Sequence, residues 1–176
     1  MQTHTFHVEL TPHPDSPTPE ALQITVEGER QTEALNLCYM LTGDCSGFAF
    51  PDTNHPAPPD RLWTRSCCEL FWRERGAAAY REYNFSPSMQ WAAYTFTAYR
   101  TREENILPSP PQRMNWTRDE SRLFLQVEIA VSPNPLQLAF AVVLKRTSGE
   151  SIYYALRHPP GSPDFHHPDN FALSSP

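Results

Sequence analysis

The sequence predicts an all-β protein, a two-sheet antiparallel β-sandwich of the jelly-roll or immunoglobulin-like type with long proline-rich loops. Three observations lead to this prediction. Apolar residues recur mainly at every second position, which is the period of a β-strand. The 176 residues include 19 prolines, which cannot donate to a helix or to a sheet ladder. Turn signals divide the chain into about nine to eleven short runs, a spacing typical of antiparallel sandwiches and barrels.

The first sixty residues contain three period-two runs and one long loop. Apolar side chains alternate over residues 6–10, 22–26 and 35–41, and proline, glycine or acidic residues follow each run. Residues 51–59 are too rich in proline for a helix. A loop of this length is long enough to carry a function.

The middle of the chain holds three strand candidates close together. They cover residues 66–72, 80–85 and 91–100. Residues 74–79 fit either a helical turn or a hairpin, and the sequence does not separate the two. Residues 86–88, Ser-Pro-Ser, predict a tight turn between the last two candidates.

The last third of the chain contains the clearest strands. A proline loop at residues 108–111 leads to a short strand near residues 114–117, and residues 159–176 read as an irregular tail. Two long period-two runs and a shorter one at residues 152–156 lie between them. A register shift of one residue would expose every apolar side chain of a run, so its faces are strongly specified. The predicted core of the two long runs is Leu123, Leu125, Val127, Ile129, Leu138, Phe140 and Val142.

Charge and length exclude some classes of function. The net charge is −6 and the 14 basic residues are scattered, which argues against a nucleic-acid partner because phosphate backbones are bound by clustered Lys and Arg. No apolar stretch approaches the ~20 residues that cross a bilayer, so we expect no membrane partner. The length suits one domain over residues 1–176.

The cysteines predict free thiols in a reducing compartment. Cys67 and Cys68 are adjacent, so on a strand they point to opposite faces and could not easily both pair with Cys38 and Cys45. No Cys-x-x-Cys spacing supports a zinc site. The N-terminus lacks the pattern of a signal peptide, and we expect a cytoplasmic protein without disulfides.

Polar and aromatic side chains share one face of the three middle strands. Such a mixture suits a polar ligand, because a sugar presents C–H faces that stack on rings and hydroxyls that hydrogen-bond to carboxylates and amides. The alternative is a solvated sheet face held by cross-strand pairs. The residues on this face are Glu69, Glu82, Asn84, Tyr94, Phe96 and Arg100.

Two chemical interpretations of the glutamate pair stay open. Glu69 and Glu82 could act as a general acid and base, since glycosidases use paired carboxylates, but such glutamates more often bond an arginine such as Arg100 or Arg65. No nucleophile elbow, phosphate-binding loop or dinucleotide motif occurs.

The tail offers weak metal ligands. They are Asp164, His166 and His167, since histidine and carboxylate together can bind zinc or another divalent ion. The alternative is a turn in which Asp164 or Asp169 caps backbone amides. We expect no metal site.

The central segments RLWTRSCCELF (61–71), YREYNFSPS (80–88) and WAAYTFTAYR (91–100), with PDFH (163–166) in the tail, resemble the DOMON-like superfamily. That group includes family-nine carbohydrate-binding modules, and the match is to its stand-alone bacterial members. The resemblance implies a sandwich with a ligand cleft on a concave face, which holds sugar or haem. For sugar, it implies that Trp63 and Trp91 stack on the ligand.

For haem, the resemblance implies an axial methionine and histidine. Met89 and Met114 are the methionine candidates, and His158 or His166 would be the partner.

The leading hypothesis is a non-enzymatic binding domain for a carbohydrate-like or other polar small ligand, without a cofactor. One alternative is a haem-binding, electron-transfer domain; another is an enzyme that acts on a sugar-like substrate through Glu69 and Glu82. The oligomeric state stays open. The candidate ligand site is Trp63, Glu69, Glu82, Asn84, Trp91, Tyr94, Phe96 and Arg100.

Overall fold

The computed structural model describes residues 3–16, 21–56, 58, 60–119 and 121–176. In this part of the chain every strand pairing is antiparallel and no α-helix occurs, only the short 3-10 turns η1 (Leu62–Thr64) and η2 (Pro168–Asn170). The predicted all-β antiparallel structure is confirmed. The strands are β1 (His4–Pro12), β2 (Gln23–Gln31), β3 (Ala34–Thr42), β4 (Phe48–Ala49), β5 (Cys67–Glu74), β6 (Tyr80–Phe85), β7 (Trp91–Ala98), β8 (Thr101–Glu103), β9 (Arg113–Arg118), β10 (Arg122–Ala130), β11 (Leu136–Arg146), β12 (Ser151–Ala155) and β13 (Leu173–Ser175).

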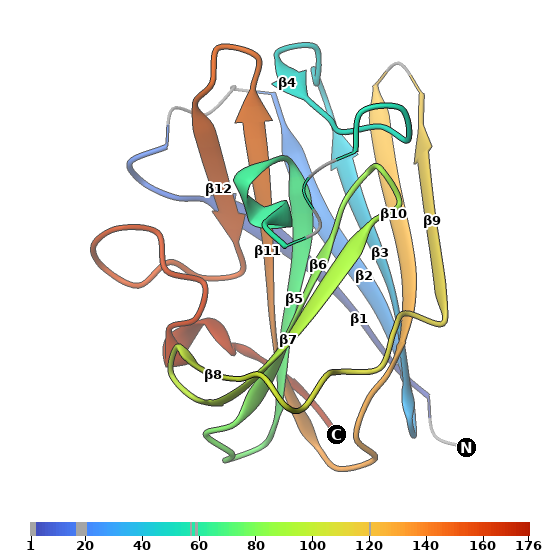
Figure 1. Ribbon diagram of the computed structural model, residues 1–176, viewed down its shortest axis with the longest axis vertical. Helices are drawn as coiled ribbons and strands as arrows, with labels where there is room; N and C mark the ends of the chain where they lie inside the picture. The colour runs from blue at the N-terminus through green and yellow to red at the C-terminus, as the bar shows by residue number, and fades with distance from the viewer. Residues whose placement is uncertain (1–2, 17–20, 57, 59, 120) are drawn as a thin grey trace.

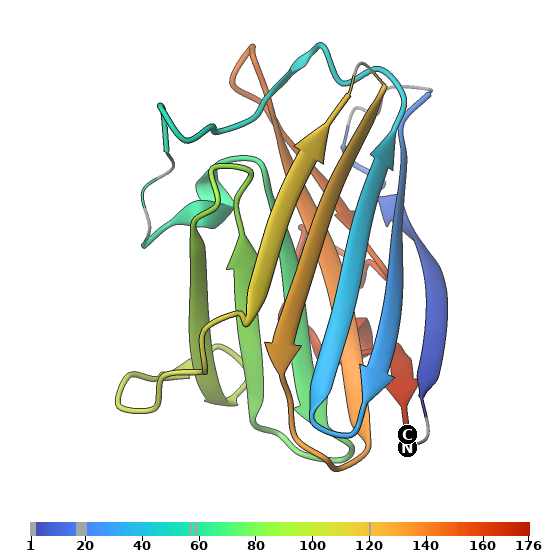
Figure 2. The same ribbon diagram turned by 90° about the vertical axis from the view of Figure 1, so that its right-hand side faces the viewer.

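The strands form one continuous hydrogen-bonded series that doubles back on itself (Figure 1). Its order is β8-β7-β6-β5-β11-β12-β1-β2-β3-β10-β9, and β4 and β13 also pair with β11. Strand β1 joins the two halves, because most of it pairs with β2 whereas Thr11 and Pro12 pair with β12. Figure 2 shows β2, β3, β10 and β9 in one layer and β5, β6, β7 and β11 behind it.

The main core lies between these layers. Alternate side chains of each strand point toward the opposite layer. The rings of Tyr39 on β3 and Phe140 on β11 therefore meet, with their centroids 6.1 Å apart. All seven core residues predicted on β10 and β11 are at most 3% exposed and belong to this cluster, which confirms the predicted face.

A second, smaller cluster covers the outer face of the β5-β6-β7-β11 layer. It contains the rings of Phe71, Tyr80 and Phe96, and the C-terminal Phe171 packs on it. Strand β11 presents small side chains here, including Ala139 and Ala141. Small residues leave room above a sheet, so this outer face is where a cavity can form.

The structure resolves one open alternative and departs from other expectations. Residues 74–79 form a hairpin turn, with Ala77 donating its N–H to the Glu74 carbonyl over 3.0 Å. The strand expected over residues 91–100 ends at Ala98, because Tyr99 and Arg100 turn into β8 and Arg100 has φ 53°. The tail expected to be irregular contains η2 and β13.

Residues 57 and 59 of the expected long loop lie outside the residues that the structure describes.

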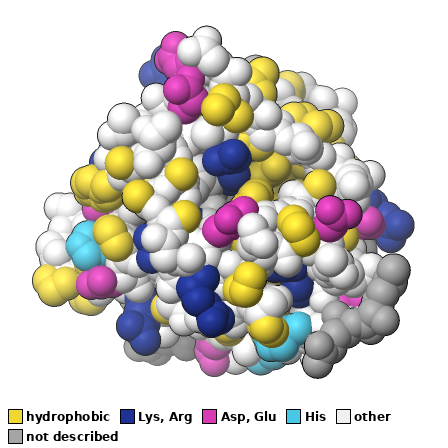
Figure 3. Space-filling view, turned by 90° about the horizontal axis from the view of Figure 1, so that it is seen from below, with side chains coloured by type: hydrophobic (Ala, Val, Ile, Leu, Met, Phe, Trp, Pro, Cys, Tyr) yellow, Lys and Arg dark blue, Asp and Glu magenta, His cyan; other side chains and the backbone are white. Residues whose placement is uncertain are grey.

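All four cysteines are free thiols, and Cys45, Cys67 and Cys68 are buried. Within the described ranges, no helix has the length and apolar character needed to span a membrane. On the lower face, Lys and Arg side chains are separated by acidic and apolar ones (Figure 3).

Candidate functional site

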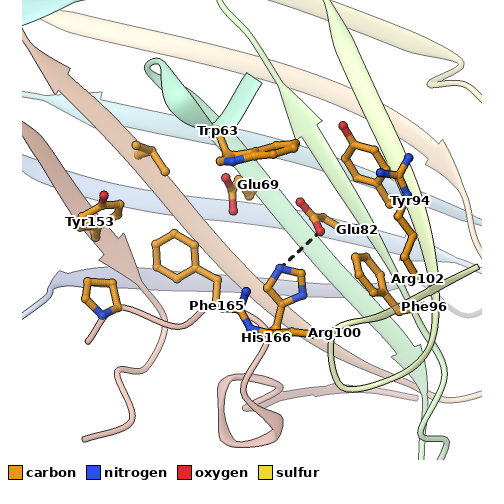
Figure 4. A pocket seen from close by; sticks show the side chains of 12 residues that line it. Trp63, Glu69, Glu82, Tyr94, Phe96, Arg100, Arg102, Tyr153, Phe165 and His166 are labelled. Carbon is orange, nitrogen blue, oxygen red and sulfur yellow. Dashed lines mark ion pairs between the residues drawn. The ribbon is translucent and has the colours of Figure 1, made fainter. Parts of the chain in front are cut away.

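A cavity of about 510 Å³ lies on the outer face of the β5-β6-β7 part of the sheet. Side chains from these strands form its floor, η1 covers one side, and the segment 163–166 covers another (Figure 4). Register explains the floor, since Phe71, Glu82 and Tyr94 are aligned across β5, β6 and β7 and share one face. The lining residues are Trp63, Glu69, Glu82, Tyr94, Phe96, Arg100, Arg102, Val143, Tyr153, Pro163, Phe165 and His166.

Aromatic side chains stand at the mouth of the cavity. Trp63 on η1 is 40% exposed, and its ring packs edge-on against Tyr94 with a centroid distance of 5.9 Å. The hydroxyl of Tyr94 donates to the Asp60 carbonyl over 3.3 Å, which fixes the ring beneath the tryptophan. The guanidinium of Arg102 lies 4.2 Å from the centroid of the same ring. Trp63 therefore offers an open ring surface to a ligand.

Two glutamates form the floor of the cavity. Glu69 on β5 is 3% exposed and Glu82 on β6 is 6% exposed. Glu69 pairs in register with Asn84, so Glu69 and Glu82 are diagonal neighbours on the same face. Asn84 Nδ2 donates to Glu82 Oε1 over 2.7 Å, and the thiol of Cys67 donates weakly to Glu69 Oε1 over 3.6 Å.

Burial changes the protonation of both carboxyl groups. Loss of solvation, and then the negative charge of Glu82, hold the pKa of Glu69 well above its ordinary value. Loss of solvation also raises the pKa of Glu82 to about 7, against the opposing effects of the Asn84 amide and the charges of Arg102 and Arg100. Near neutral pH the floor is therefore only partly ionised.

His166 closes the cavity beside these carboxyl groups. The hydroxyl of Tyr80 lies 2.8 Å from its Nδ1 and accepts the backbone N–H of Arg100 over 3.2 Å. The hydroxyl proton is therefore free to go to Nδ1, which leaves the imidazole proton on Nε2, 3.6 Å from Glu82 Oε2 (Figure 4). Burial, assisted by the charge of Arg100, lowers the pKa of His166 to about 4. The imidazole is neutral at neutral pH.

Asp164 fastens the tail segment to the turn between β7 and β8. Its carboxylate accepts from the Tyr99 hydroxyl over 2.6 Å and from Arg100 Nη2 over 2.8 Å. It also accepts the backbone N–H of His166 over 3.1 Å. This is the amide-capping turn that was the alternative to a metal site. In the part of the chain that the structure describes, no three His, Cys, Asp or Glu side chains gather as metal ligands would.

Most of the residues predicted from the sequence come together in this cavity. Six of them line it, and Asn84 is fully buried behind Glu82 as its hydrogen-bond donor. Trp91 is not among the lining residues, and this corrects its expected stacking role there. It is an odd-numbered residue of β7, so strand alternation turns it away from Tyr94 and Phe96. The six lining residues are Trp63, Glu69, Glu82, Tyr94, Phe96 and Arg100.

Sequence reasoning missed several lining residues, and it expected an arginine to bond the two glutamates. The missed residues include Arg102, Tyr153 and Phe165. The sequence did contain a signal for Tyr153. This residue lies between the buried Ile152 and Tyr154 on β12, so its side chain points to the opposite face of the strand. The two arginines expected to bond the glutamates do not do so: Arg100 pairs with Asp164, and Arg65 lines a separate depression.

The residues that a haem would require are not assembled. Met89 lies in the turn between β6 and β7 and is 41% exposed. Met114 on β9 packs against the main core, on the far side of the sheet from the cavity. His158 bonds the Thr11 carbonyl over 2.7 Å, so of the four candidates only His166 faces the cavity.

No protein-family model matches the chain, and no curated protein matches its sequence. Among solved structures, a presumed carbohydrate-binding protein from Bacteroides uniformis aligns with a TM-score of 0.61 and 14% identity over 95% of this chain and 83% of its own. A family-nine carbohydrate-binding module from Caldicellulosiruptor kristjanssonii, in complex with cellotriose, aligns with a TM-score of 0.60 and 10% identity over 88% and 75%. A complex of such a module with glucose aligns at 0.57 and 11% over 88% and 76%. The predicted resemblance is thus shown at the level of the fold.

Proposed function

We propose that this chain is a two-sheet β-sandwich that binds a carbohydrate-like, ring-shaped polar ligand in the cavity on its outer face and leaves the ligand chemically unchanged. The observation that carries the proposal is the open Trp63 ring above a floor of two buried glutamates. An apolar ring and convergent polar groups are what a sugar requires, because its C–H face stacks while its hydroxyls hydrogen-bond.

The size and composition of the cavity support this proposal. A volume of about 510 Å³ lies within the usual range for small-ligand sites. The aromatic surfaces of Trp63, Tyr94 and Phe165 line it together with carboxyl and guanidinium groups. The fold resembles that of family-nine modules, whose solved complexes contain cellotriose in one case and glucose in another.

The test uses the two partly exposed tryptophans as a matched pair. Trp63 and Trp91 are 40% and 39% exposed, but only Trp63 lines the cavity. Calorimetric titration with glucose and with cellotriose should show binding to the wild type. Trp63→Ala should weaken it at least tenfold, since the loss of an apolar ring contact costs about 1.5 kcal/mol or more.

Trp91→Ala should leave the affinity unchanged. Equal losses in the two variants would place the site elsewhere, and the absence of binding to any sugar would refute the proposal. NMR spectra of the sugar recovered after incubation should be unaltered, since an enzyme would convert it.

A further inference from the structure

The two carboxyl groups on the cavity floor have no cationic partner. Among the described residues, the only basic side chain within ion-pair distance of either is that of His166, which is neutral at neutral pH. Arg100 is engaged by Asp164, and the guanidinium of Arg102 lies over the Tyr94 ring. Ionising a buried carboxyl group without a cation in contact is unfavourable, which is why both groups hold their protons to a higher pH than usual, even though the charges of Arg102 and Arg100 act on Glu82. A cation bound against the floor would stabilise the ionised forms.

When its carboxyl groups are ionised, the same part of the floor also has more acceptors than donors. Asn84 is completely buried and its Oδ1 has no hydrogen-bond partner, while its Nδ2 is already used by Glu82. Glu69 receives only the weak thiol donor of Cys67, and its side chain points into the cavity (Figure 4). An ammonium group brings three N–H donors and a positive charge together. It supplies both of the missing features.

The walls are compatible with a cation. Trp63, Tyr94 and Phe96 line the cavity, and ring faces attract ammonium groups through their quadrupoles. The guanidinium of Arg102, which lies over the Tyr94 ring, belongs to an exposed residue of β8, whereas the glutamates are buried on the floor. The groups that complement a cationic part of the ligand, the two glutamates, are therefore on the floor of the cavity.

We propose that the ligand is a cyclic amine of sugar size, such as an amino sugar, whose ammonium is held between Glu69 and Glu82. The inference rests on the proposed binding function and names the chemical class of the ligand. A neutral sugar would supply no positive charge to stabilise the ionised glutamates. An acidic sugar would instead depend on Arg102.

Proton linkage distinguishes these three ligand classes. Both carboxyl groups have raised pKa values, so an ammonium that pairs with their ionised forms expels protons from the floor. An acidic ligand favours the protonated floor and takes protons up. A neutral sugar falls between the two.

The experiment is a calorimetric titration with glucosamine, glucose and glucuronic acid, each in two buffers of different ionisation enthalpy at pH 6.5. We expect glucosamine to bind the wild type at least tenfold more tightly than glucose and to release protons. Glu69→Gln and Glu82→Gln should reduce this preference to within about threefold. Thermal melts confirm that both variants fold, and the proton count on the wild type is informative without them.

Three results would overturn the inference. Glucose binding as tightly as glucosamine, or glucuronic acid binding most tightly, would refute the amine while the binding function stands. Glucosamine binding without proton release would show that the glutamates do not hold it. If none of the three sugars bound, the proposed function and the inference would both fail.

Discussion

Nε2 of His166 lies 3.6 Å from Oε2 of Glu82, yet the two side chains are not charged at the same pH. Burial lowers the pKa of His166 to about 4 and raises that of Glu82 to about 7. Between these values both groups are neutral; above pH 7 only the glutamate is charged, and below pH 4 only the histidine. The contact is therefore a polar contact within the cavity wall rather than a salt bridge, and it leaves the glutamate available to a ligand.

The first prediction concerns the pH dependence of stability. The carboxyl of Glu82 has an ordinary pKa of 4.5, raised to about 7 in the folded state. Its contribution to stability is fully present below pH 4.5 and is lost as the pH rises through about 7. Glu82→Gln keeps the acceptor for Asn84 but cannot ionise, so its stability relative to the wild type should increase over this range by up to about 3 kcal/mol.

Urea unfolding at pH 4.5, 6 and 8 measures this difference. Glu104→Gln is the control, because that glutamate is exposed in a loop. His166 acts in the opposite direction in both proteins, since its lowered pKa gives stability that is lost as the pH falls from 6.5 through about 4. A difference between Glu82→Gln and the wild type that stays constant with pH would contradict the assignment.

The second prediction concerns the wall formed by the tail. Asp164→Ala removes two hydrogen bonds that fasten residues 163–166 to the β7–β8 turn and a third that holds the backbone of His166 within the segment. We expect a loss of about 1–2 kcal/mol in the free energy of unfolding, and weaker ligand binding because Phe165 and His166 are released. Hydrogen exchange should accelerate at the amides of residues 164–167.

Asp169→Ala is the matched control. Its carboxylate is 72% exposed and lies 3.7 Å from His167, outside the cavity. Exchange rates and affinity in that variant should match the wild type. If the Asp164 variant also matched the wild type, the tail would not hold the cavity wall.

The third prediction tests the face of β10. Leu125 is fully buried between the layers, whereas Gln126 is exposed on the outer face of the same strand. Leu125→Ala should cost about 2–5 kcal/mol through lost burial and the cavity left behind, and Gln126→Ala less than about 0.5 kcal/mol. Chemical denaturation measures both. Equal costs would contradict the register.

Alternation made the sheet predictable, and non-local contacts limited the prediction of the site. Runs such as β10 and β11 have one apolar parity, which fixes strand and face together. The carboxyl groups of Glu69 and Glu82 were assigned to one face on the same basis, and the structure places them on it. Trp91 is the opposite case. Its position on β7 differs in parity from that of Tyr94, so strand alternation by itself indicates that the two side chains point to opposite faces and do not share a pocket.

The tail could not be placed from the sequence. Phe165 and His166 are in a segment without periodicity, and they reach the cavity through Asp164 and the Tyr80 hydroxyl. Contacts of this kind join residues 64 to 86 positions apart. No local pattern encodes them, so the sequence indicated histidine and carboxylate in the tail but not the arginine and tyrosine partners that they use.

The most direct test of the central claim is a two-dimensional ¹⁵N–¹H NMR titration that follows the indole N–H signals of the four tryptophans, at positions 63, 72, 91 and 116. Trp63 stands at the cavity mouth, Trp72 and Trp116 pack against the main core, and Trp91 lies outside the cavity. With glucose or glucosamine added, the Trp63 signal should shift progressively to saturation while the other three stay in place. A saturable shift at Trp91 in place of Trp63, or no shift at any of the four, would contradict binding in this cavity.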